Sequence, residues 1–129
     1  MKYILLMNTM KAGTEGLDWP EQALKNHIAY MFALNKDLSD AGQLVDAQGL
    51  TFPDQAKIVR AGADGRPITD GVFPESKEFL AGYWLVDVEQ PEQAYQIAAR
   101  ASAAPGPDGQ PLRLEIEVRP VMDGHHADL

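Results

Sequence analysis

The alternation of apolar and polar positions predicts a small sheet. Tyr3 to Met7 is a compact apolar run between polar residues, and Gly82 to Val88 is a second run, rich in aromatic and β-branched side chains. Both have the length and composition of buried strands. Leu112 to Val118 alternates apolar with charged residues, which is typical of a strand with one solvated face, and Pro120 closes it. Residues 43–50 are a mixed stretch that is consistent with a further short strand.

Two amphipathic helices are expected between these strands. The first begins at a cap-like sequence, residues 18–21, with a proline in the first turn, where its missing N–H group costs nothing. Gly42 ends it as a C-cap glycine. The second runs from Pro91 to Ala103. Their apolar stripes consist of Leu24, Ile28, Met31, Leu34, Leu38 and Ala41 in the first helix, and Ala94, Ile97, Ala98 and Ala101 in the second.

A hairpin is expected in the middle of the chain. Lys57 to Ala61 and Arg66 to Thr69 are short strand-like runs around residues 62–65, whose Asp-Gly pair favours a tight turn. Segments 11–17 and 104–111 are expected to be loops, and residues 70–81 are the least regular part. We expect one domain over residues 1–122, followed by a flexible C-terminal tail at residues 123–129.

The order β-α-β-β-α-β with an extra central hairpin predicts a ferredoxin-like α+β fold. In this topology an antiparallel sheet carries two helices on one face, the first and third core strands are central, and the last strand is an edge. The central runs are apolar on both faces, whereas the helices cover only one. The uncovered apolar face needs a partner. The simplest partner is a second copy of the chain, packed sheet against sheet in a two-fold homodimer.

The amino-acid composition mainly excludes certain partners and certain kinds of chemistry. The 129 residues carry a net charge of −8, which repels phosphate backbones, so nucleic acid is not an expected partner. The chain has no cysteine, which excludes disulfides, thiol nucleophiles and Cys-ligated zinc and fits a reducing compartment. No apolar stretch approaches the ~20 residues of a membrane helix. We therefore expect a cytoplasmic protein without a membrane partner.

Several segments resemble the YCII-related proteins. Residues 1–6 resemble their opening strand, and Ala41-Gly42 and Gly49-Leu50 match the end of their first helix and the following turn. Residues 69–78, Thr-Asp-Gly-Val-Phe-Pro-Glu-Ser-Lys-Glu, resemble the family's Asp-Gly-Pro-Phe signature, with a valine in place of the usual proline and a proline in place of the usual alanine. Residues 82–84 and 117–121 fit the third and last strands, so the resemblance covers nearly the whole chain.

The resemblance implies a dimeric α/β-barrel fold, in agreement with the dimer argued above. It supplies no established activity. Some relatives are proposed to be acid–base enzymes that use a histidine and an aspartate. Others occur beside, or fused with, extracytoplasmic-function sigma factors. In the enzyme-like branch the histidine lies on the first helix. His27 lies on the corresponding helix of this chain, but about one turn farther from the helix end at Gly42 than the histidine of those relatives.

Asp70 and His27 are the candidate catalytic residues. Asp70 precedes a glycine at the end of a strand, where a carboxylate beside the sheet could act as a base. The alternative is that it caps its own turn. His27 shares a helix face with Met31, Leu34 and Leu38, which directs it towards the sheet, and a histidine there can transfer protons near neutral pH. Equally, it could be a core histidine satisfied by one hydrogen bond.

Aromatic and charged side chains could complete a ligand site between helix and sheet. The expected ligand-binding residues are Tyr3, Tyr30, Phe73, Glu75, Lys77 and Tyr83. The alternatives are that the aromatic residues belong to the core and the dimer interface, which we favour for Trp84, and that the charged ones form a solvated loop face. The adjacent histidines of the tail are not expected to bind a metal. The sequence has no phosphate loop, nucleophile elbow or dinucleotide fingerprint, so no cofactor is expected.

Two functions fit these features. One is a cofactor-free lyase, isomerase or hydrolase-like enzyme that moves protons with Asp70 and His27, which requires both side chains to face one cavity. The other is a non-catalytic binding or regulatory module, which requires only the pocket. The fold does not decide between them.

Overall fold

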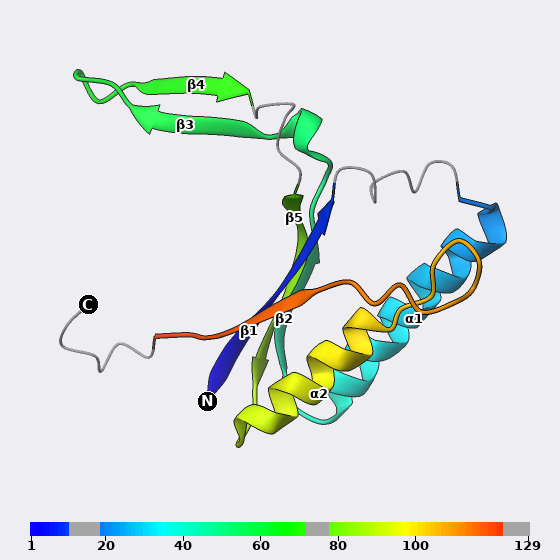
Figure 1. The fold of residues 1–129 in the computed structure, drawn as a ribbon. Helices are drawn as coiled ribbons and strands as arrows, with labels where there is room; N and C mark the ends of the chain where they lie inside the picture. The colour runs from blue at the N-terminus through cyan, green and yellow to red at the C-terminus, as the bar shows by residue number, and fades with distance from the viewer. Residues whose placement is uncertain (11–18, 72–77, 123–129) are drawn as a thin grey trace.

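The computed structural model describes residues 1–10, 19–71 and 78–122 and shows an α+β fold (Figure 1). Its antiparallel sheet has the order β2-β5-β1-β6. The helices α1 (Glu21–Asp40) and α2 (Pro91–Ser102) lie on one face of this sheet. The strands are β1 (Lys2–Met10), β2 (Leu44–Gly49), β5 (Glu78–Asp87) and β6 (Ile116–Pro120). The predicted ferredoxin-like arrangement, with the first and third core strands at the centre, is confirmed.

The core lies between the sheet and the helices. Tyr3 and Leu5 of β1 are paired with Val86 and Trp84 of β5, and all four side chains are buried. Because side chains alternate across a strand, these four share one face. The helices pack on that face through buried residues of their predicted stripes, Leu34 and Leu38 of α1 and Ala94, Ile97, Ala98 and Ala101 of α2. The small alanines let α2 lie close to the sheet.

The other side of the sheet carries no helix among the described residues. Here Ile4 is paired with Leu85 and Leu6 with Tyr83, and all four side chains are only partly buried. We call this the uncovered face. Its apolar character follows from strands that are apolar at successive positions rather than at alternate ones.

The buried face of α1 differs from the predicted stripe. Leu34 and Leu38 are buried, but Leu24 and Ile28 are 39% and 44% exposed. At 3.6 residues per turn, Ile28 lies about a quarter turn from the mean direction of the buried pair, and Leu24 lies about a sixth of a turn from it, in the first turn of the helix. The first half of α1 therefore directs His27 and Met31, rather than Leu24 and Ile28, towards the sheet.

The C-terminal cap of α1 agrees with the prediction, whereas its N-terminal cap is only partly described. Helix α1 begins at Glu21 with Pro20, from the predicted cap-like sequence, as its N-cap residue and without a side-chain hydrogen bond at that position. Asp18 lies outside the described residues. At the other end Gly42 has a φ of +71°, and the N–H groups of residues 42 and 43 donate to the carbonyls of residues 39 and 38. This is a Schellman motif, and it confirms the C-cap glycine.

Two strands begin several residues away from their predicted starts. Strand β5 begins at Glu78, four residues before the predicted start. Strand β6 begins at Ile116 rather than at Leu112. The N–H groups of Leu112 and Arg113 donate instead to the carbonyls of residues 104 and 102, at 2.9 and 2.8 Å. This segment is thus paired with the end of α2, although its alternation is typical of a strand.

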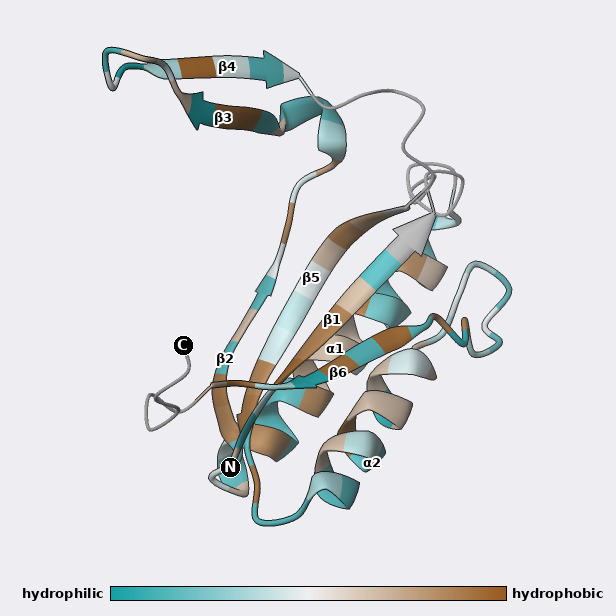
Figure 2. Ribbon diagram, turned by 60° about the vertical axis from the view of Figure 1, so that its left-hand side comes forward, coloured by the Kyte–Doolittle hydropathy of each residue, from teal (hydrophilic) through white to brown (hydrophobic). Residues whose placement is uncertain are grey.

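The predicted hairpin is present and stands apart from the sheet. Strands β3 (Lys57–Ala61) and β4 (Pro67–Gly71) form their own two-stranded sheet after a short 3-10 helix, η2 (Pro53–Gln55). Their turn contains Gly65 at a φ of +83°. The hairpin projects from the body of the molecule (Figures 1 and 2).

The predicted loop at residues 11–17, the centre of the 70–81 segment and the tail lie outside the described residues. Within the described part of the chain, no helix is long and apolar enough to cross a membrane.

Gly82 is required where β2 approaches β5. A Cβ atom on this residue would lie 2.9 Å from the carbonyl oxygen of Gln48, which real side chains do not tolerate. We expect Gly82→Ala to lower the free energy of unfolding by about 1–3 kcal/mol, since the backbone must shift. Gly49→Ala is the matched control, because its Cβ would meet nothing within 4 Å. Urea titration of both variants measures the difference, and equal stabilities would contradict this account.

Candidate functional site

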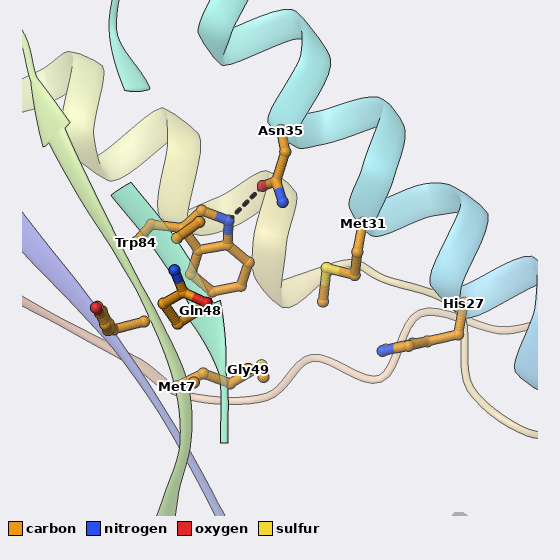
Figure 3. Close-up of a pocket in the computed structure, with 10 residues that line it drawn as sticks. Met7, His27, Met31, Asn35, Gln48, Gly49 and Trp84 are labelled. Carbon is orange, nitrogen blue, oxygen red and sulfur yellow. Dashed lines mark hydrogen bonds between the residues drawn. The ribbon is translucent and has the colours of Figure 1, made fainter. Parts of the chain in front are cut away.

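A pocket of about 230 Å³ lies between α1 and the sheet, where β1, β5 and β2 lie side by side. Figure 3 shows its lining. Among the described residues that form the lining, none has a carboxylate, lysine or arginine side chain. The lining residues are Met7, His27, Met31, Asn35, Ala47, Gln48, Gly49, Gly82, Tyr83 and Trp84. The described part of the lining therefore combines apolar groups with uncharged polar groups and one histidine.

Helix α1 positions one wall of the pocket. His27, Met31 and Asn35 are spaced four residues apart, so they lie one above the other on the same side of the helix. Figure 3 shows all three projecting from α1 towards the strands. On the sheet side, Gly82 lets the end of β2 come close to β5, so that main-chain atoms at Gly49 form part of the lining.

His27 has one ring nitrogen fixed by the backbone. Its Nδ1 lies 2.9 Å from the carbonyl oxygen of Pro105. A carbonyl oxygen can only accept, so Nδ1 carries the proton and donates, which makes Nε2 the acceptor of the neutral imidazole. The indole of Trp19 packs edge-on against the imidazole, with 5.4 Å between the ring centroids. The ring is thus held in one orientation and one tautomer.

Asn35 and Trp84 are joined at the other end of the pocket. The Nε1–H group of Trp84 donates to Oδ1 of Asn35 at 2.8 Å (Figure 3). The indole is only 5% exposed, so this bond satisfies a donor that water does not reach freely. Trp84 is a core residue, as predicted, and it also lines the pocket.

Tyr83 contributes to the lining but directs its hydroxyl group elsewhere. The hydroxyl donates to a carboxylate oxygen of Asp46 at 2.8 Å. Strand pairing places Gln48 opposite Tyr83 and Asp46 opposite Leu85, so this hydrogen bond belongs to the uncovered face. It lowers the pKa of Asp46 below its ordinary value of 3.8, because it stabilises the charged carboxylate, and it raises the pKa of Tyr83.

The predicted site residues are not all brought together. His27 and Tyr83 line the pocket. Tyr3 is buried in the core, and the hydroxyl group of Tyr30 donates to the carbonyl of Arg100 at 2.8 Å, between the helices. Neither Tyr3 nor Tyr30 is among the residues that line the pocket. The remaining predicted ligand-binding residues, Phe73, Glu75 and Lys77, lie outside the described residues.

Asp70 is not part of the pocket of its own chain. It lies within β4, exposed and paired with Ile58 across the hairpin. The hairpin projects away from α1 and the four-stranded sheet (Figure 1), between which the pocket lies. The structure therefore does not place Asp70 and His27 in one cavity, as a direct acid–base pair within one chain would require. In the described part of the chain, no group of three potential ligands is placed to hold a metal ion.

The model of the YCII-related domain matches residues 1–106. The chain belongs to this family. An uncharacterized protein of Rhizobium meliloti (strain 1021) is 27% identical over 103 residues, which are 80% of this chain and 79% of that protein. The YCII match ends before β6, although β6 pairs with β1 in the same sheet. Neither comparison names a reaction.

Sequence reasoning did not identify Asn35 as a site residue. The available signal was the spacing of 27, 31 and 35, which continues the helix face that His27 was already assigned to. Asn35→Ala leaves the indole N–H of Trp84 without its acceptor, and we expect a loss of about 1–3 kcal/mol in the free energy of unfolding. Gln22→Ala removes an exposed hydrogen bond on the same helix and should cost far less. Urea titration compares them, and equal losses would contradict the role of Asn35.

The Tyr83–Asp46 hydrogen bond predicts a pH effect. The pKa of Asp46 is depressed in the folded chain, so its stabilising contribution is present above the unfolded pKa and is lost as the pH falls through the folded pKa. In Tyr83→Phe we expect the pKa of Asp46 to rise towards 3.8. Carbon-detected NMR titration of the Asp46 carboxyl group measures this. Tyr95→Phe, at an exposed tyrosine of α2, is the control. An unchanged pKa of Asp46 in Tyr83→Phe would contradict the assignment.

Proposed function

We propose that this chain binds a small, uncharged and partly apolar molecule in the pocket between α1 and the sheet. The observation that carries the proposal is the lining itself: a cavity with apolar walls and one imidazole fixed by a backbone carbonyl. Apolar walls with a few placed polar groups are typical of ligand sites. At about 230 Å³ the pocket lies below the usual ~300–1,000 Å³ range for drug-sized ligands. A small molecule therefore suits it best.

His27 is the residue that would orient the ligand. With Nδ1 donating to Pro105, the neutral imidazole offers Nε2 as an acceptor, so a ligand hydroxyl or amide N–H group is the expected partner. The amide group of Asn35 supplies further donors, because its oxygen already accepts from Trp84. A ligand with one donor and one acceptor on an apolar frame matches this arrangement.

The same histidine is the group that would carry out proton transfer in an enzyme. A neutral imidazole with Nε2 as its acceptor can remove a proton from a bound molecule and return it, which is the chemistry of a cofactor-free lyase or isomerase. Among the described residues that line the pocket, the only other titratable one is Tyr83, whose hydroxyl group donates to Asp46 on the uncovered face. The lining therefore supports binding more directly than a two-residue acid–base mechanism, and a regulatory module that binds a small molecule fits it equally.

Ligand binding can be tested with matched alanine positions. We expect members of a library of small neutral compounds with one hydroxyl or amide group to shift the amide resonances of α1 and β5. Ala47→Leu, in β2, places extra volume in the pocket and should abolish these shifts, whereas Ala33→Leu, at an exposed position of α1, should preserve them. Shifts that survive Ala47→Leu would place the binding elsewhere.

The role of His27 can be tested with the same compounds. His27→Ala removes one hydrogen bond of about 0.5–1.5 kcal/mol, which corresponds to binding weakened by up to about tenfold. Compounds without a hydrogen-bond donor should bind the parent and the variant equally. If both classes lose affinity to the same extent, the effect arises from packing rather than from Nε2. For any ligand that the parent converts, loss of turnover with retained binding would identify His27 as the proton carrier.

We also propose that two copies of the chain associate through the uncovered face. Support comes from Ile4, Leu6 and Leu85, which lie together on this face without a covering element among the described residues. Burial of such a face is worth roughly 25 cal/mol per Å² of apolar surface. Sedimentation velocity should give a particle of twice the chain mass, and Leu6→Glu should give a single chain. A parent that sediments as one chain would contradict the proposal.

A further inference from the structure

The β3–β4 hairpin, residues 57–71, is an arm whose two strands are paired with each other and not with the four-stranded sheet. Every residue of both strands is exposed. Its large apolar side chains, Ile58, Val59 and Ile68, are 49%, 58% and 43% exposed. An isolated two-stranded hairpin is marginally stable in water and needs a surface to pack against. The arm is therefore incomplete as it stands in a single chain.

Apolar side chains lie on both faces of the arm. The pairing of Ile58 with Asp70, and of Arg60 with Ile68, puts two isoleucines on one face. The pairing of Val59 with Thr69, and of Ala61 with Pro67, defines the other face, where the only charged side chain of the two strands is that of Lys57. A solvated hairpin normally keeps one face polar. This one offers an apolar contact surface.

The direction of the arm relates it to the uncovered face. In Figure 1 the helices lie on one side of the sheet, and the arm extends to the opposite side from the end where β5 begins. That side is the one where a second copy would pack against Ile4, Leu6 and Leu85. The arm thus lies on the side of the sheet where the proposed interface lies.

Charge points to the same occupant. Residues 57–71 carry Lys57, Arg60 and Arg66 against Asp64 and Asp70, a net charge of +1. Because the whole chain has a net charge of −8, the remainder has −9. The arm is therefore a positive segment attached to an acidic body, and the body of a second copy has the opposite sign of charge.

We infer that the arm of each copy docks on the body of the other, so that two arms clasp the dimer. The inference rests on the proposed sheet-to-sheet dimer and names the element that holds it together. Two-fold symmetry makes the contact reciprocal, since each copy gives one arm and receives one. In this arrangement the apolar faces of the arm are buried by the partner and the unpaired edges of β3 and β4 are covered.

The first test changes the arm without touching the core. Val59→Asp puts a charge on the more apolar face of the arm. Because the side chain of Val59 is exposed, we expect the substitution to leave the fold of the single chain intact. Phe32→Asp is the matched control, at an apolar residue of α1 that is 69% exposed and lies on the helix side of the molecule. We expect sedimentation to show at least a tenfold weaker dimer for Val59→Asp and an unchanged dimer for Phe32→Asp.

The second test uses the absence of cysteine from the chain. Val59→Cys and Phe32→Cys each provide one attachment point for a benzophenone maleimide. On irradiation, the label at residue 59 should join two chains, and peptide mapping should place the adduct on the body of the other copy. The label at residue 32 should give no joined chains.

The outcomes distinguish the clasping arm from the proposed sheet-to-sheet dimer and from ligand binding. A dimer whose strength is unaffected by Val59→Asp, and whose residue 59 crosslinks only within its own chain, overturns the clasping arm and leaves the sheet-to-sheet dimer standing. A parent that sediments as a single chain overturns both. Ligand binding in the pocket is read from separate resonances and is decided independently of either result.

Discussion

The structure depends on the pairing of β1 with β5, two adjacent central strands that are apolar on both faces. On one face Tyr3, Leu5, Trp84 and Val86 form the buried layer on which both helices pack. The other face receives the intervening residues of the same strands, which two helices cannot reach. The pairing register of a strand determines which side chains lie on each of its two faces, because a side chain cannot change sides without a shift of register. The uncovered face is thus a direct consequence of the pairing that creates the core.

The pocket follows from a change in the inward-facing residues of α1. Near its C-terminal end, Leu34 and Leu38 fill the space above the sheet and are almost fully buried. One to two turns earlier, the same side of the helix carries Met31 and His27, which leave part of that space open. The cavity is therefore not an isolated defect. It begins where close-packed leucines give way to a flexible thioether and a hydrogen-bonded imidazole.

Much of the fold was predictable because periodicity and caps are local properties. The runs at 3–7 and 82–88, the glycine at 42 and the alanine stripe of α2 each identified an element or a boundary. The assignment of Leu24 and Ile28 to the buried face was wrong because composition does not distinguish an apolar flank from an apolar core. The start of β6 was wrong because residues 112 and 113 bond to the end of α2. Such long-range hydrogen bonds leave no periodic signal.

The site was predicted less completely, for a physical reason that concerns Asp70. Its place beside a glycine at a strand end was a local inference, whereas its distance from His27 depends on where the hairpin projects. The arm carries Asp70 away from the pocket of its own chain and to the side where a second copy is proposed to lie. An acid–base reaction that used both residues would therefore have to be shared between two copies. A reaction confined to one copy would rely on His27, with the backbone of Pro105 fixing its tautomer.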